Sequence, residues 1–175
     1  MKETIQDLKT RRSCRRYQDR QIADEELDQI LEIGTYAPTA MNLQTPVMVV
    51  VQDPKTLKTL SAMNAAVWGK DIDPFYGAPT AVIVLADRTK KNYMQDGSLV
   101  LGNLMNAAHA LGVGSCWINR AKEMFDTDEG KAFLKKWGLE GDYAGVGICI
   151  LGYCAEGGER PAAPRKPGYI LRPER

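Results

Sequence analysis

A cluster of basic residues near the start of the chain is the strongest candidate for chemistry. The stretch LKTRRSCRRYQDR, residues 8–20, contains six arginines and lysines: Lys9, Arg11, Arg12, Arg15, Arg16 and Arg20. The whole chain of 175 residues has a formal net charge of only +1. A near-neutral chain lacks the basic footprint of a nucleic-acid-binding protein, so we expect the cluster to have a local role.

Three interpretations of this cluster are open. The arginines can be a solvated helix end with no ligand. Cys14 can be a reactive thiol, because nearby cations stabilise a thiolate. The third interpretation is an anion pocket, in which arginines bind phosphate through two-point hydrogen bonds and Ser13 donates another.

Two further segments favour the anion pocket. The stretch APRKP, residues 163–167, is a second basic patch near the other end of the chain and contains Arg165. The stretch APTAMNLQTPVMVVV, residues 37–51, places Asn42 and Gln44 just before an apolar strand. Side-chain amides both donate and accept hydrogen bonds and can therefore bind a flat heterocycle. Two basic patches that converge on one phosphate would explain both, and the amide segment by itself only suggests a heterocycle.

The hydropathy pattern predicts an α+β fold in one domain, with four buried strands and about five helices. We expect strands over residues 45–54, 80–87, 113–119 and 144–154. Helices are expected over residues 3–12, 23–37, 55–66, 98–111 and 125–140. Residues 155–175 are rich in proline and glycine, which predicts an irregular arm laid over a surface.

The predicted helix over residues 98–111 is apolar nearly all round. Such a helix must be covered on all sides. In a chain of this length, part of that cover is expected from a second subunit.

The composition also excludes several classes of protein. No apolar run is long enough to cross a membrane, and the charged start MKETIQDLKT does not resemble a secretory signal. The four cysteines form no C-x-x-C pair, which indicates reduced thiols in a cytoplasmic protein. His109 is the only histidine, so we expect neither a histidine triad nor a metal site, and place His109 in the core or an interface.

Taken together, these motifs resemble the nitroreductase family of FMN-dependent oxidoreductases. The family's R-R-S-x-R is Arg11-Arg12-Ser13-Cys14-Arg15, followed by an aromatic residue at Tyr17. Its A-P-S-x-x-N-x-Q is APTAMNLQ, and its buried helix and strand match QDGSLVLGNLMNAAHALGVGSCWI. The closing segments match GLEGDY, ILGY and APRKP. The resemblance covers the whole chain in the same order.

The resemblance implies a nitroreductase-like fold, with a central mixed, mainly antiparallel sheet flanked by helices in an intertwined homodimer. It implies two FMN sites, each built from both subunits. Arg11, Arg12, Ser13 and Arg165 would hold the phosphate and ribityl chain, and Arg15 would lie at the pyrimidine side of the flavin. Pro38, Thr39 and Asn42 would reach in from the partner, and Gly114 and Ser115 would lie near the flavin's reactive face.

The resemblance also implies an activity. NADH or NADPH would give hydride to flavin N5, and a nitroaromatic, quinone or related acceptor would then take the electrons in a ping-pong mechanism. The alternatives are a non-enzymatic anion- or flavin-binding module and a specialised member, either a dehalogenase or a flavin-cleaving enzyme. Ala163 stands where the family often has a lysine, and this departure predicts weaker phosphate binding.

Overall fold

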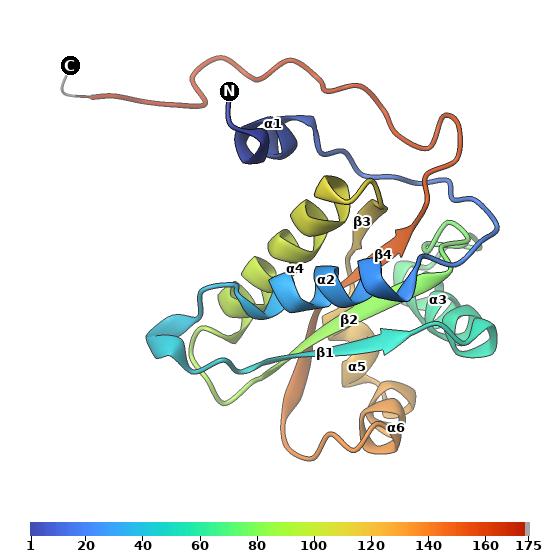
Figure 1. Ribbon diagram of the computed structural model, residues 1–175. Coiled ribbons are helices and arrows are strands. Elements are labelled where there is room, and N and C mark those ends of the chain that lie inside the picture. The colour runs from blue at the N-terminus through green and yellow to red at the C-terminus, as the bar shows by residue number, and fades with distance from the viewer. Residues whose placement is uncertain (174–175) are drawn as a thin grey trace.

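The core of the protein is a four-stranded antiparallel sheet. The computed structural model describes residues 1–173, so Glu174 and Arg175 of the predicted arm lie outside the described residues. The strands are β1 (Pro46–Val51), β2 (Thr80–Asp87), β3 (Gly114–Ile118) and β4 (Tyr143–Gly152). They lie in the order β1-β2-β4-β3, and every pair is antiparallel (Figure 1).

Six α-helices and one 3₁₀ turn complete the described residues. The helices are α1 (Glu3–Thr10), α2 (Asp24–Thr35), α3 (Pro54–Trp68), α4 (Tyr93–Ala110), α5 (Ala121–Asp126) and α6 (Asp128–Lys136), and the turn η1 is Ala40–Asn42. The predicted α+β class, the strands and most helices are confirmed. Residues 161–173 form no helix or strand, and Figure 1 shows them running away from the sheet past α1.

The single helix predicted over residues 125–140 was wrong, because the chain forms two helices there. Thr127 separates them: its hydroxyl accepts a hydrogen bond from the Gly130 amide at 3.0 Å, which caps the start of α6. The hydroxyl also donates to the Met124 carbonyl at 2.6 Å, at the end of α5. One side chain thus ends one helix and starts the next.

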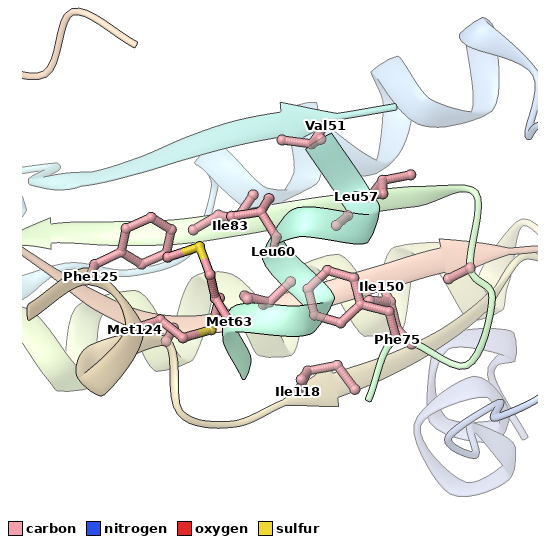
Figure 2. Close-up of a cluster of buried hydrophobic side chains, with 14 of the residues drawn as sticks. Val51, Leu57, Leu60, Met63, Phe75, Ile83, Ile118, Met124, Phe125 and Ile150 are labelled. Atoms are coloured by element: carbon pink, nitrogen blue, oxygen red, sulfur yellow. The ribbon is translucent and has the colours of Figure 1, made fainter. Parts of the chain in front are cut away.

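The alternating side chains of β2 build two separate hydrophobic layers. Ala81, Ile83 and Leu85 face one layer, whereas Val82, Val84 and Ala86 face the other. Helices α3, α5 and α6 cover the first layer, part of which Figure 2 shows, with Phe125 among its fully buried side chains. Helices α2 and α4 cover the second layer. Both faces are buried, which explains why β2 and β4 are continuous apolar runs in the sequence.

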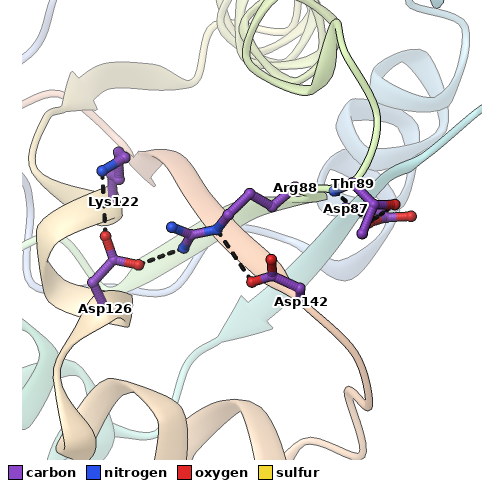
Figure 3. Close-up of polar contacts among 6 residues, drawn as sticks. All are labelled: Asp87, Arg88, Thr89, Lys122, Asp126 and Asp142. Atoms are coloured by element: carbon purple, nitrogen blue, oxygen red, sulfur yellow. Dashed lines mark hydrogen bonds and ion pairs between the residues drawn. The ribbon is translucent and has the colours of Figure 1, made fainter.

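An ion-pair cluster ties the far end of the sheet to α5. The Arg88 guanidinium pairs with Asp126, and its Nε lies 3.2 Å from Asp142 Oδ1 (Figure 3). The hydrogen bond from Arg88 holds the pKa of Asp126 below its usual range. Lys122 adds a contact of 3.3 Å to the same carboxylate. Each of these charges lies within ion-pair distance of an opposite charge and none belongs to a predicted site residue, so we assign the cluster to the fold.

The expectation that all four cysteines are reduced was wrong for one pair. Cys14 and Cys154 form a disulfide with a Cα–Cα distance of 6.0 Å, across a sequence separation of 140. Cys116 and Cys149 are free and buried, and burial raises the pKa of the Cys149 thiol well above its usual range. The disulfide forms because the basic segment passes beside the end of β4, where Tyr17 and Cys154 form an isolated bridge. Among residues 1–173, no helix is both long and apolar enough to cross a membrane.

A close contact between β4 and α5 gives a test of the fold. A methyl group on Gly145 would lie 2.3 Å from the Ala121 carbonyl oxygen, which is backbone and cannot move aside. Gly145→Ala should therefore lower the free energy of unfolding by about 1–3 kcal/mol, the usual cost of overpacking. Urea denaturation measures this loss.

Glu123→Ala is the matched control, because it places an alanine on the exposed side of α5, the helix that Gly145 contacts. Its effect should stay within about 0.5 kcal/mol. Equal stability of Gly145→Ala and the wild-type protein would contradict the packing of α5 on β4.

Candidate functional site

Arginines of both basic segments line one small pocket. Its volume is about 280 Å³. The lining residues are Arg11, Arg12, Ser13, Arg15, Arg160, Pro161, Ala162, Ala163 and Arg165. Five arginines from two ends of the chain therefore surround one cavity.

The N-terminal wall of this pocket is fixed by α1, α4 and β3. Helix α1 ends at Thr10, whose hydroxyl lies 2.8 Å from His109 Nε2 on α4. Beyond it the chain crosses the start of β3, where the Cys14 amide donates to the Ser115 carbonyl at 2.9 Å. A Cβ on Gly114 would lie 2.9 Å from the Cβ of Cys14, so glycine is needed for this close approach. The predicted residues Gly114 and Ser115 thus lie directly beside the basic segment.

The C-terminal wall is held to the N-terminal wall by backbone hydrogen bonds. The Arg15 amide donates to the Gly158 carbonyl at 2.8 Å, and the Ala155 amide donates to the Arg16 carbonyl at 2.9 Å. This short ladder brings the residues after β4 alongside the basic segment. Arg160 and Arg165 thereby line the same pocket as Arg11.

Several polar groups of this site lack a partner within residues 1–173. Arg11 Nη1 and Ser115 Oγ are buried and make no hydrogen bond in that part of the chain. Buried polar groups in proteins are nearly always hydrogen-bonded, so an unpaired one indicates a missing ligand or water. An anion with several acceptor oxygens would pair with a guanidinium and a hydroxyl at once.

The charge of the pocket supports the same ligand class. None of its five arginines forms an ion pair with a carboxylate among the described residues. Arg12 is partly engaged, because its Nη1 donates to the Lys9 and Arg11 carbonyls at 2.8 and 2.6 Å and so helps to end α1. The pocket thus combines a high positive charge with unsatisfied donors.

Pro38, Thr39 and Asn42, which sequence analysis assigned to the same site, do not line this pocket. They lie on the loop between α2 and β1, at the N-terminal end of α4, where the Ala40 amide donates to Asp96 at 3.0 Å. The basic segment lies at the other end of α4, beside His109. His109 lies thirteen positions after Asp96 in the same helix, a distance of about 20 Å along its axis. One chain therefore holds the two groups of predicted residues apart.

The loop carrying Thr39 and Asn42 has an unusual backbone. Met41, Asn42 and Gln44 have φ values of 53°, 54° and 50°, a left-handed conformation that costs roughly 1 kcal/mol or more for a residue other than glycine. The backbone amide of Gln44 donates a hydrogen bond to the Thr39 hydroxyl at 3.0 Å, which helps to hold the loop in this conformation. Strained backbone of this kind concentrates at functional sites.

Arg160 was missed by sequence analysis. It lies outside the stretch 163–167, in the irregular tail, where no sequence motif marks it. Only its position next to Ala155–Gly158, which pair with the basic segment, brings it into the pocket. Its guanidinium adds positive charge to the pocket.

A larger cavity of about 930 Å³ lies between α3 and residues 69–79. Its lining includes none of the predicted site residues. Asp73, one of the acidic groups that line it, already accepts hydrogen bonds from the Ser61 hydroxyl and the Phe75 and Gly77 amides. We therefore place the candidate site at the smaller, arginine-lined pocket.

Comparisons with known proteins agree with the motifs. The Nitroreductase family model matches residues 8–73 and 72–153. An Archaeoglobus fulgidus protein provisionally named NADH dehydrogenase/NAD(P)H nitroreductase is 34% identical over 161 residues, which cover 87% of this chain and 86% of the relative.

Solved structures give the same result. A Bacteroides fragilis nitroreductase with bound FMN superposes with a TM-score of 0.90 at 31% identity, covering 98% of this chain and 99% of its own. An FMN-dependent nitroreductase from Clostridium difficile gives a TM-score of 0.81 at 26% identity, covering 97% and 98%. Since a family model and a relative each match most of the chain, this protein belongs to the nitroreductase family.

Proposed function

We propose that this protein is an FMN-dependent oxidoreductase that takes electrons from NADH or NADPH. The observation that carries the proposal is the pocket of five arginines, beside which Arg11 Nη1 and Ser115 Oγ are buried and have no hydrogen-bond partner among residues 1–173. The names of the relatives and the FMN in the Bacteroides fragilis structure support the choice of cofactor.

The residues of the pocket fit the phosphate end of FMN. Arg11, Ser13, Arg160 and Arg165 would hold the phosphate, with Arg12 closing the pocket at the end of α1. A phosphate dianion offers acceptor oxygens to several guanidinium groups, which bind it with two-point geometry. At about 280 Å³ the pocket lies just below the roughly 300–1,000 Å³ of ordinary ligand sites. It would therefore hold the phosphate end, and the ring would lie beyond it.

Bound FMN would accept hydride from NAD(P)H and pass electrons to a nitroaromatic, quinone or related acceptor. The protein's own residues then have three tasks: to bind the phosphate, to place the ring, and to stabilise negative charge on the reduced ring. Arg15, which lines the pocket and is exposed, is our candidate for the third task.

The phosphate assignment predicts how binding depends on the ligand's phosphate. Arg11→Ala and Arg165→Ala should each weaken FMN binding by about 1.5–3 kcal/mol, the range for a charged hydrogen bond. Neither change should alter the weaker binding of riboflavin, which lacks the phosphate. Fluorescence titration of the purified protein with both flavins measures this difference.

Lys58→Ala is the matched control, because it removes one positive charge from the larger cavity. This variant should bind FMN like the wild-type protein. If the wild-type protein binds neither flavin, the proposed function is wrong. Tight FMN binding without oxidation of NADH or NADPH would instead support a flavin-binding module.

The assignment of Arg15 predicts a change in reduction potential. A cation near the pyrimidine side of the flavin meets a ring that is neutral when oxidised and negative when reduced, so it favours electron uptake. Arg15→Ala should lower the midpoint potential of the bound flavin, by about 30 mV for each 1.4 kcal/mol of lost interaction. Arg15→Lys should restore part of the change, since it keeps the charge. Anaerobic titration at saturating FMN measures the potentials.

Arg16→Ala is the control for this experiment. Arg16 is the next residue in the chain, is exposed, and does not line the pocket, so its loss should leave the potential unchanged. Equal potentials for the wild-type protein and Arg15→Ala would show that Arg15 only anchors the cofactor.

We further propose that the complete site forms only in a homodimer. The two groups of predicted residues lie at opposite ends of α4, about 20 Å apart, so one chain cannot bring both to one flavin. Large apolar side chains are exposed near both groups and on the arm: Ile5, Leu8, Ile33, Tyr36, Met41, Leu43, Leu99, Tyr169, Ile170 and Leu171. A second chain would cover them.

The arm is the proposed link between the subunits. Tyr169, Ile170 and Leu171 are 71–79% exposed, which is unusual for three consecutive apolar residues. Strand β1 is an edge strand of the sheet. We propose that the arm crosses to the partner and adds a strand to the partner's sheet.

A shared site predicts complementation between two defective chains. One chain carries Arg11→Ala in the pocket. The other carries Asn42→Ala, which removes the loop amide and places alanine at a φ of 54°. Each homodimer should bind FMN weakly, but the mixed dimer has one undamaged site and should bind about one FMN per dimer.

Differently tagged chains, co-expressed and purified through both tags, provide the mixed dimer. Flavin absorbance per protein measures the stoichiometry. A mixed dimer that binds no more FMN than the two homodimers would contradict the shared site, as would a monomer in sedimentation at micromolar concentration.

A further inference from the structure

The disulfide Cys14–Cys154 lies between the two walls of the arginine pocket. Cys14 is flanked in the sequence by Ser13 and Arg15, which line the pocket, and Cys154 precedes Arg160 by six residues. The bond therefore joins the segment that supplies Arg11, Arg12 and Arg15 to the segment that supplies Arg160 and Arg165.

Apart from this bond, the two segments are held together by non-covalent contacts alone. Gln18 donates to the Cys154 carbonyl at 3.1 Å, Arg16 donates to the Glu156 carbonyl at 3.4 Å, and the Arg20 guanidinium lies 3.6 Å from the centre of the Tyr153 ring. The backbone hydrogen bonds are those from Arg15 to Gly158, from Ala155 to Arg16 and from Gln18 to Tyr153, at 2.8–2.9 Å. Exposed or half-exposed backbone hydrogen bonds of this kind open easily. The covalent bond is the strongest tie between the walls.

Electrostatic repulsion opposes this arrangement. Five guanidinium groups face one cavity, and among residues 1–173 no carboxylate pairs with any of them. Like charges on the two walls push the walls apart when no anion lies between them. The disulfide holds the walls at the spacing that a bound anion needs, before the anion arrives.

The two cysteines of the bond differ in exposure. Cys14 is fully buried, whereas Cys154 is only partly buried. A thiolate of a dithiol reductant can attack Cys154 Sγ, which releases Cys14 as a thiolate that then takes up a proton. The second thiol of the reductant resolves the mixed disulfide, so that two electrons and two protons pass to the protein and the reductant becomes a disulfide.

We propose that Cys14 and Cys154 form a reversible redox-modification site that sets the anion affinity of the arginine pocket. The oxidised form holds both walls in place and binds the anion tightly. The reduced form lets the C-terminal wall move away and binds the anion more weakly. The identity of the anion as FMN rests on the proposed function, whereas the redox site itself does not.

The first test counts thiols and follows the C-terminal wall without any ligand. In protein purified without reductant and then denatured, alkylation should label two cysteines, Cys116 and Cys149, and four after treatment with dithiothreitol. Native protein should be cut by trypsin after Arg16, whose carbonyl accepts a hydrogen bond from the Ala155 amide of the C-terminal wall, at least several-fold faster once reduced. Labelling of all four cysteines without reductant would overturn the proposal.

The second test measures the dissociation constant of FMN with and without dithiothreitol. Reduction should raise it about tenfold in the wild-type chain. Cys154→Ser should show the weaker value under both conditions, and Cys116→Ala, which keeps the disulfide, should behave like the wild-type chain. Equal affinities for the oxidised and reduced wild-type chain would overturn the proposal.

The two tests separate this inference from the proposed function. A protein with two labelled cysteines and redox-dependent cleavage that binds no FMN in either state would support the redox site and refute the FMN assignment. A protein that binds FMN equally in both states would support the cofactor and refute the redox control.

Discussion

Repulsion between like charges is the constraint on which the site depends. Two unit charges 4 Å apart near a protein surface interact by roughly 4 kcal/mol, and the pocket gathers five arginines from segments more than 140 residues apart. The fold opposes this repulsion with a disulfide, a short backbone ladder and two close contacts that need glycine. A Cβ on Gly114 would meet Cys14, and a Cβ on Gly158 would lie 2.7 Å from Cys154 Sγ. The local structure thus keeps the positive charge concentrated where an anion can neutralise it.

Helix α4 sets the distance between the two halves of the candidate site. Its buried face, with Val100, Leu101 and Leu104, fixes it on the sheet. Its two ends are tied to the functional segments, through Asp96 to the loop at Ala40 and through His109 to Thr10. Since a helix has a fixed rise per residue, the separation of these segments does not adapt to a ligand. Under the proposed function, a complete site would therefore need a second copy of the chain.

The sequence was sufficient to predict the features that depend on local patterns. The continuous apolar run over residues 80–87 predicted β2, and the spacing of Arg11, Arg12 and Arg15 predicted that these arginines act together, as their shared place in the pocket allows. Two features depend on tertiary proximity and were not predictable in this way. The pairing of Cys14 with Cys154 crosses 140 residues, and Arg160 enters the pocket only because of the ladder at Gly158. The division between α5 and α6, by contrast, was predictable from local sequence. Thr127 before Asp128 and Glu129 is a recognisable N-cap that the sequence analysis did not use.

The strained loop between α2 and β1 matters both for the fold of one chain and for the proposed dimer. Met41 combines a left-handed backbone with a side chain that is 85% exposed, and both features are unfavourable in an isolated chain. Within the chain, the Asp96 carboxylate and the Thr39 hydroxyl hold the loop in shape, but neither covers Met41. A partner subunit packed on the loop would bury this side chain and bring Asn42 to the arginine pocket across the interface. Folding of the loop and completion of the site would then have the same physical cause, because the apolar contact that compensates for the strain also places the amide.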